Sequence, residues 1–202
     1  MVRQTSAAFV ALTLVLVACE NEIAIPQVAL SSTLTAQRSA ELTDGFGRCP
    51  TPGGPWLTIG EYRGPSKEQT TVVIDGEQVE GSPVALDCSV VANGDKFDVD
   101  ATAEIRSNEG GSVRITGSFS PSGVQTGVRA VFQRADYGQF SAQNCTVTYY
   151  DTTTEDPSTS FRGVAAGRVW GFLDCPSAQN VSSNTACLGK AQFRFENCSK
   201  GQ

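Results

Sequence analysis

The feature that most constrains this chain is an alternation of apolar and polar side chains, which recurs in short segments after Trp56. In the segment 97–106 every second side chain is apolar: Phe97, Val99, Ala101, Ala103 and Ile105. A period of two places these side chains on one face of a strand and the intervening polar ones on the other. The segments 84–92, 113–119 and 124–132 repeat the pattern, and turn sequences such as Asn93-Gly94-Asp95 separate them.

Apolar spacing typical of a helix is not sustained over three turns anywhere after residue 50. Further strands are predicted at 57–62, 71–75, 145–150, 163–175 and 190–198. Around Trp170 both faces of the segment are apolar, which indicates a central strand covered on both sides. We therefore predict an all-β fold, a single antiparallel β-sandwich or barrel-like domain. In the predicted strand 124–132 we expect Val124 and Thr126 to be the first two inward-facing residues.

The N-terminus carries an apolar run of eleven residues, 7–17, interrupted only by Thr13 and preceded by Arg3. A spanning helix needs about 20 apolar residues, so this run fits the core of a signal peptide instead. The run ends in Leu16-Val17-Ala18-Cys19, which resembles the lipobox of bacterial lipoproteins. An ordinary secretory signal cleaved near Ala18 is the alternative.

The lipoprotein resemblance implies that residues 1–18 are removed and that Cys19 becomes the first mature residue. Its sulfur would carry a diacylglycerol and its new amino group an acyl chain such as palmitate, which would anchor the protein in a membrane. Position 20 is Glu; many lipoproteins kept in the inner membrane of Gram-negative bacteria have Asp there. The resemblance therefore favours an envelope protein of the outer membrane.

The segment 19–48 is rich in Ser, Thr, Ala and Gln and shows no clean periodicity. We interpret it as a lipidated N-terminus followed by a flexible tether, and we place the β domain at 49–202. Within that domain the polar run 152–160 is predicted to be an exposed loop.

Once Cys19 is assigned to the lipid, an even number of cysteines remains: Cys49, Cys88, Cys145, Cys175, Cys187 and Cys198. In an exported protein this predicts three disulfides. If the segments 169–175 and 188–198 form an antiparallel pair around a polar loop, Cys175 and Cys187 meet at the base of that loop. We therefore favour a Cys175–Cys187 bridge, with Cys187–Cys198 as the rival. Cys198 would then pair with Cys145 or Cys49, and Cys88 with the one left over.

Composition excludes several classes of function. The chain has no histidine, which removes Ser-His-Asp and Cys-His hydrolases and His-ligated metal sites. The net charge of −6 argues against a nucleic-acid partner, because nucleic-acid backbones are held by basic surfaces. We therefore expect no catalytic residues, and a non-enzymatic protein.

The outward face of one predicted strand carries a row of carboxylates, Asp98, Asp100 and Glu104. Such a row has the hard oxygen ligands that Ca²⁺ prefers, and two carboxyls are also the machinery of glycoside hydrolysis. The bland alternative is a solvated face with ion pairs, in which Glu104 lies opposite Arg114. We expect no resident cofactor or metal, with this row as a weak candidate for calcium.

Aromatic side chains offer stacking faces for sugars but are more often part of a core. The candidates are Trp56, Tyr62, Tyr137, Tyr149, Tyr150 and Trp170. The sequence as a whole indicates a lipid-anchored envelope protein that acts as a binding or structural module, with a glycan or a protein as its partner. The alternatives are a carbohydrate hydrolase that uses carboxylates alone and a calcium-stabilised adhesion or carbohydrate-binding module.

Overall fold

The fold is all-β, as predicted. The computed structural model describes residues 24–36, 47–49, 54–62, 70–149 and 163–199, so the lipobox, the predicted 152–160 loop and Tyr150 lie outside the described residues. The strands in chain order are β1 (Gln27–Ala36), β2 (Gly47–Arg48), β3 (Leu57–Ile59), β4 (Val73–Ile74), β5 (Gln78–Val79), β6 (Ser82–Asn93), β7 (Lys96–Ile105), β8 (Gly111–Phe119), β9 (Gln125–Arg134), β10 (Gly138–Thr148), β11 (Gly163–Ala165), β12 (Arg168–Asn180) and β13 (Thr185–Glu196).

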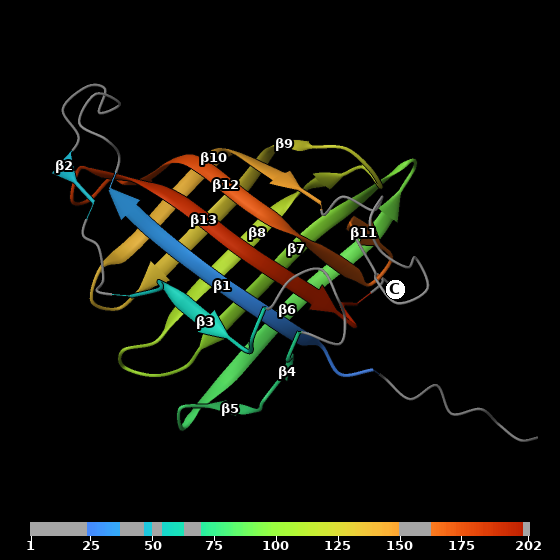
Figure 1. Ribbon diagram of the computed structural model, residues 1–202, viewed down its shortest axis with the longest axis horizontal. Coiled ribbons are helices and arrows are strands. Elements are labelled where there is room, and N and C mark those ends of the chain that lie inside the picture. Colours follow the sequence, from blue (N-terminus) through green and yellow to red (C-terminus); the bar gives the residue numbers. More distant parts are fainter. Residues whose placement is uncertain (1–23, 37–46, 50–53, 63–69, 150–162, 200–202) are drawn as a thin grey trace, which may run out of the picture.

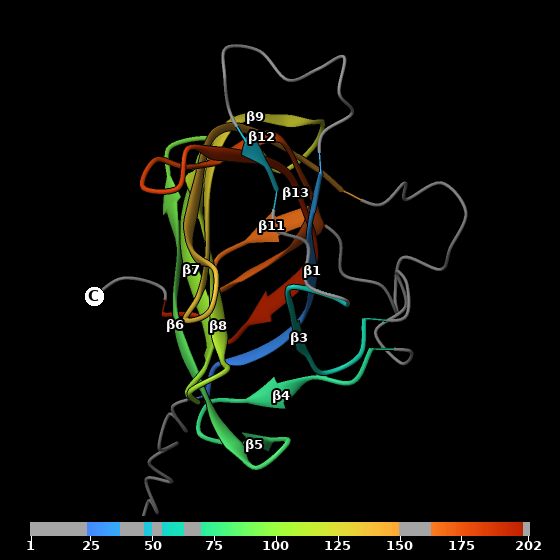
Figure 2. The same ribbon diagram turned by 90° about the vertical axis from the view of Figure 1, so that its left-hand side faces the viewer.

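A single sheet curls into a barrel that is nearly closed (Figures 1 and 2). Its order is β3-β1-β13-β12-β10-β9-β8-β7-β6-β5, and the pairs along this path are antiparallel. Strands β1, β13, β12 and β10 form one wall, and β9, β8, β7 and β6 face them from the other. None of the described segments forms a helix with the length and hydropathy that crossing a bilayer requires.

The seam of the barrel lies along β6, and that edge is covered by the nearby turn at Gly76 and by two segments distant in sequence. Gly76 N donates a hydrogen bond to Val84 O at 2.9 Å. Farther along, Ser199 N donates to Cys88 O at 3.0 Å, and Gly167 N donates to Val90 O at 2.9 Å. Strand β4 also pairs with β1, so it links the two sides of the seam. This coverage satisfies backbone groups that an open edge would offer to other chains.

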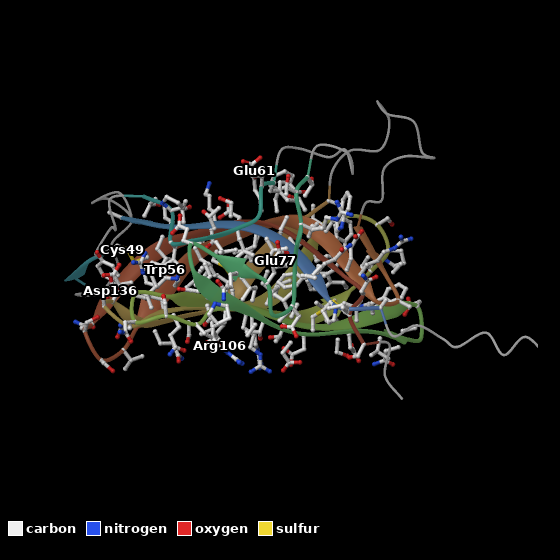
Figure 3. The ribbon with its side chains drawn as sticks, turned by 90° about the horizontal axis from the view of Figure 1, so that it is seen from below. Cys49, Trp56, Glu61, Glu77, Arg106 and Asp136 are labelled. Carbon is white, nitrogen blue, oxygen red and sulfur yellow. A yellow bond between two sulfur atoms is a disulfide. The ribbon has the colours of Figure 1, made fainter. Side chains whose placement is uncertain are left out.

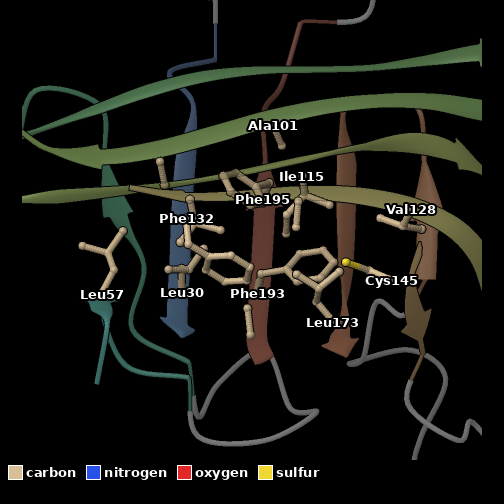
Figure 4. Packing of buried hydrophobic residues seen from close by; sticks show 14 of the residues in the cluster. Leu30, Leu57, Ala101, Ile115, Val128, Phe132, Cys145, Leu173, Phe193 and Phe195 are labelled. Atoms are coloured by element: carbon tan, nitrogen blue, oxygen red, sulfur yellow. The ribbon is translucent and has the colours of Figure 1, made fainter. Parts of the chain in front are cut away.

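The interior is filled by large apolar side chains from both walls (Figure 4). The largest fully buried ones that face each other there include Leu30, Ile115, Phe132, Phe193 and Phe195. Close packing is visible at Gly189, where an added Cβ would lie 2.8 Å from a ring carbon of Phe132. The predicted alternation in 97–105 and 113–119 is confirmed, since Val99, Ala101, Val113 and Ile115 point inward and are buried.

The predicted tether, 19–48, is wrong over Gln27–Ala36. These residues form β1, which pairs with β13 along its whole length, from Gln27 opposite Glu196 to Ala36 opposite Cys187. Val28, Leu30 and Leu34 are buried in the core. Ser32 belongs to the same inward row, and its Oγ donates to Leu57 O at 3.2 Å. A serine whose hydroxyl is satisfied inside the core hides the period of two from a reading that counts only apolar residues. The barrel therefore begins at least 22 positions before the predicted start at residue 49.

Two details of register also differ from the prediction. Val113 lies opposite Ala103, not Ile105, because the β7–β8 ladder ends at Glu104 opposite Ser112 and the turn between them includes a bond from Gly110 N to Ser107 O at 3.1 Å. In β9 the inner row begins at Gln125, while Val124 and Thr126 are exposed. Gly127 has a φ of +69°, a conformation natural only to glycine, and this irregularity reverses the faces before Val128.

The three predicted disulfides are confirmed, but the favoured pairing is wrong. The bridges are Cys49–Cys187, Cys88–Cys198 and Cys145–Cys175. The rival Cys187–Cys198 bridge is also wrong, since Cys187 pairs with Cys49. The expected pairing of Cys198 with Cys145 or Cys49 is wrong too, since Cys198 pairs with Cys88.

The error comes from the length of the β12–β13 hairpin, which itself was predicted correctly. Both strands continue through the supposed polar loop, and only residues 181–184 form the turn. Cys187 consequently lies opposite Ala178, and Cys175 opposite Gly189. Ala178 is buried opposite Cys187 and Asn180 is buried two positions later, so the alternation continues past Cys175 through inward residues that are small or polar.

Candidate functional site

The acidic row on β7 is a solvated, ion-paired face. Arg114 binds Asp100 through two nitrogens at 2.9 and 2.6 Å, and Arg106 lies 3.4 Å from Glu104. Asn93 Nδ2 donates to Asp98 at 2.7 Å. The expected pairing of Glu104 with Arg114 is wrong, because Arg114 sits opposite Thr102 and reaches Asp100 diagonally.

The Asp100 carboxylate raises the pKa of Arg114, first through the hydrogen bond and then through its charge. Each acid of the row has its own partner, and no three metal-ligating side chains come together among the described residues. A role of this row in calcium binding stays a prediction.

Most of the aromatic candidates are structural. Trp56 and Trp170 are buried, and the Tyr149 hydroxyl donates to Ser120 O at 3.0 Å in a site where burial raises the pKa of Tyr149. Tyr137 is half-buried, 5.8 Å from Trp56. Tyr62 is half-buried, and its ring meets that of Phe172 edge-on at 6.2 Å. Phe172 is itself half-buried on the outward face of β12.

The prediction that Trp170 is covered on both sides is confirmed, and a charged cluster shares its outer face. The guanidinium carbon of Arg194 lies 4.2 Å from the centre of the Trp170 ring. Arg194 Nη2 is 2.6 Å from Glu196 Oε2, and Gln27 Nε2 donates to the same oxygen at 2.6 Å. Arg194 and Glu196 are both buried, so the ion pair and the amide satisfy each other away from water.

A groove with a mixed polar and apolar lining crosses the outer face of the wall formed by β1, β13, β12 and β10, which faces the viewer in Figure 1. It has a volume of about 490 Å³, within the range of ligand sites. The strand registers arrange its outward side chains in two rows that run across the strands. The first row is Thr33, Lys190, Asp174 and Thr146, and the second is Ser31, Gln192, Phe172 and Thr148. We call this surface the four-strand groove.

The four-strand groove is accessible and electrically balanced. Its side chains are half-buried or exposed. Lys190 Nζ lies 3.4 Å from Asp174 Oδ2, and this ion pair connects β13 to β12 in the first row. Next to the second row along the strands come Arg194 and Trp170, which are buried, so the groove ends there. The site thus combines hydroxyls, one amide, one compensated ion pair and one ring.

A second cavity, of about 610 Å³, opens at the end of the barrel between β3, the β5–β6 turn and the β7–β8 turn. Figure 3 shows Cys49, Trp56 and Asp136 at this end. The guanidinium of Arg134 lies 5.8 Å from the Trp56 ring and 5.4 Å from the Tyr137 ring. Its Nε also binds Asp136 at 3.1 Å. The cation of this cavity is already engaged within the protein, as Lys190 is in the four-strand groove. The cavity is lined largely by turns, whereas the groove lies on strands that are paired on both sides, which makes the groove the better candidate.

Reasoning from the sequence did not find the four-strand groove. Only Tyr62, at its margin, was among the predicted residues. The signal was a run of Thr and Ser at alternate outward positions of 31–33 and 146–148, and its meaning depends on strand registers that a single sequence does not give. Comparison of the chain with models of protein families, with curated proteins and with solved structures finds no match.

Proposed function

We propose that this protein is a lipid-anchored, non-enzymatic binding module of the bacterial cell envelope and that the four-strand groove is its binding surface. The observation that carries the proposal is the groove itself, an open surface where two rows of side chains, all but Phe172 able to form hydrogen bonds, are held at fixed spacing. Strands flanked on both sides hold these side chains more rigidly than loops would, which suits a preorganised site.

The lipobox supports the anchored part of the proposal. Cys19 precedes β1 by eight residues, which reach at most about 28 Å when fully extended. Because Gln27–Ala36 belongs to the barrel, this linker is much shorter than the sequence suggested. A lipidated Cys19 would therefore keep the barrel close to the membrane surface.

The arrangement of carboxylates supports binding over hydrolysis. A glycosidase that uses only carboxylates needs two of them facing one substrate. The four-strand groove contains one, Asp174, and Lys190 already engages it. Asp98, Asp100 and Glu104 lie instead on β7, in the opposite wall of the barrel.

Binding is tested by sedimentation with purified cell envelope that has been washed with detergent, using the full-length protein in detergent. We expect the unaltered protein to sediment with the envelope and the double variant Lys190→Ala/Gln192→Ala to lose at least about tenfold in affinity. Gln133→Ala is the matched control, since Gln133 is an exposed glutamine on β9 in the opposite wall. Equal binding by the groove variant, or no binding by the unaltered protein, would overturn the proposal.

The anchor is tested separately by Cys19→Ser. We expect this variant to leave the membrane fraction and to partition into the aqueous phase of a detergent extraction, because two or three acyl chains account for stable anchoring. A Cys19→Ser protein that stays with the membranes would contradict the lipoprotein assignment and leave the groove unaffected.

A further inference from the structure

Most side chains that line the four-strand groove can form hydrogen bonds, and the groove carries no net charge. Four of its eight outward side chains are hydroxyls: Ser31, Thr33, Thr146 and Thr148. The others are an amide, an aromatic ring and two opposite charges that are paired with each other. Resting on the proposed function, we propose that the ligand is a neutral polysaccharide strand, bound across the sheet with its length perpendicular to the strands.

The spacing of the two rows supports an elongated, repeating ligand. Neighbouring strands lie about 4.8 Å apart and successive outward residues along one strand about 7 Å apart. Each row crosses four strands, so the lined surface is about 14 Å long and two residues wide. A chain of sugar rings presents hydroxyls at regular intervals along both edges. Two parallel rows of donors and acceptors can engage both edges at once, whereas a single sugar would occupy only part of the surface.

The charge of the groove selects against ionic ligands. Lys190 and Asp174 neutralise each other at 3.4 Å, and the remaining lining carries no formal charge. The chain as a whole has a net charge of −6, which repels polyanions at long range. A neutral ligand is not repelled by the net charge and brings no charge of its own that the groove would leave unpaired. Its sugar hydroxyls can donate to Asp174 and accept from Lys190.

The pairing of the strands selects against a peptide that adds itself to the sheet. Strands β1, β13, β12 and β10 are each flanked by neighbours on both sides. Their backbone groups are therefore used within the barrel, and an extended peptide would find no edge here to extend. Recognition at this face must come from side chains, which is how proteins read sugars.

The Phe172 ring gives the groove its apolar contact. It stands in the second row between Gln192 and Thr148, and the edge-on ring of Tyr62 lies 6.2 Å away. Sugar rings have one or two faces of C–H groups, and an aromatic ring buries such a face while hydroxyls and amides bind the rim. Phe172 thus supplies the apolar part of the affinity, and the flanking polar side chains orient the ligand.

The test is calorimetric titration of the full-length protein with soluble hexamers of neutral sugars. The probes are the β-1,4-glucose, β-1,3-glucose, α-1,4-glucose and N-acetylglucosamine hexamers, with hexagalacturonate as the acidic counterpart. We expect at least one neutral hexamer to bind, and at least tenfold weaker binding in both Phe172→Ala and Gln192→Ala. Gln133→Ala should bind within about twofold of the unaltered protein.

Gln192 is exposed, so Gln192→Ala keeps the test valid even if Phe172→Ala fails to fold. Binding of none of the neutral hexamers, tighter binding of hexagalacturonate, or full binding by Gln192→Ala would each overturn the inference. If the protein sediments with the envelope, the Lys190→Ala/Gln192→Ala variant does not, and no neutral hexamer binds, then the inference fails and the proposed function stands. If the envelope does not retain the protein at all, the proposed function itself fails.

Discussion

Leu30→Ala is the most direct test of the first strand. Leu30 is fully buried in β1, opposite Phe193 of β13 on one side and Ile59 of β3 on the other. The substitution removes buried methyl groups and leaves a cavity, and Leu→Ala changes in cores cost about 2–5 kcal/mol. Paired strands on both sides of β1 limit collapse of the cavity. We therefore expect a loss of about 3–5 kcal/mol in the free energy of unfolding, and a fall in Tm of about 10 °C.

The assay is urea unfolding without reductant, followed by far-ultraviolet circular dichroism and by the fluorescence of Trp56 and Trp170, which are both buried. Thr35→Ala is the matched control, because Thr35 is exposed on the same strand and should change stability by less than about 0.5 kcal/mol. A loss below about 1 kcal/mol for Leu30→Ala would refute the placement of Gln27–Ala36 in the core and restore the tether.

Three further predictions follow from covalent, ionic and titrating groups. Replacing Cys88 and Cys198 by Ser should lower the free energy of unfolding in urea by about 4 kcal/mol, because with the Cys49–Cys187 bridge in place the Cys88–Cys198 bridge closes a loop of about 50 residues. A loss under about 1 kcal/mol would contradict the Cys88–Cys198 bridge. Arg194→Ala should cost about 3–5 kcal/mol, since it leaves a buried glutamate unpaired, whereas Asp100→Asn on the exposed face should cost less than about 1 kcal/mol; equal losses would refute the distinction. Burial raises the pKa of Tyr149, so the unfolded state ionises first and the free energy of unfolding should fall above about pH 10. Tyr149→Phe should reduce that fall in urea unfolding measured at alkaline pH. An unchanged dependence of stability on pH would exclude Tyr149 as its source.

The inward face of a strand can be predicted from the sequence when its inward and outward residues differ clearly in hydrophobicity. In 97–105 and 113–119, inward residues without polar side chains alternate with charged or hydroxyl outward ones, and the faces were predicted correctly. In β1 the inward row includes Ser32, and in the second half of β12 it includes only Ala178 and Asn180, so the alternation is almost invisible. The strand structure of β1 comes from β13, a partner distant in sequence, and that of the second half of β12 from the start of β13 across a short turn. In both places pairing overrides weak local preference.

The disulfides and the groove were less predictable, because both depend on register. A shift of three positions between Cys175 and Ala178 decides whether Cys187 meets one or the other. The four-strand groove likewise exists only because Thr33, Lys190, Asp174 and Thr146 fall into one row. Each of these residues on its own looks like an ordinary exposed polar side chain of a strand.

The pairing of the first strand with the last has a consequence for how the protein is made. Gln27 lies opposite Glu196, so the contacts between β1 and β13 span nearly the whole chain and have the highest contact order of the sheet. In the exported protein that we propose, β1 leaves the translocation channel first and waits without its principal partner until β13 has crossed. Folding is then completed only after translocation, close to the membrane to which the N-terminus is already committed. Until that moment the edge of β1 is open to other chains, which makes this interval the time when a periplasmic chaperone would matter most.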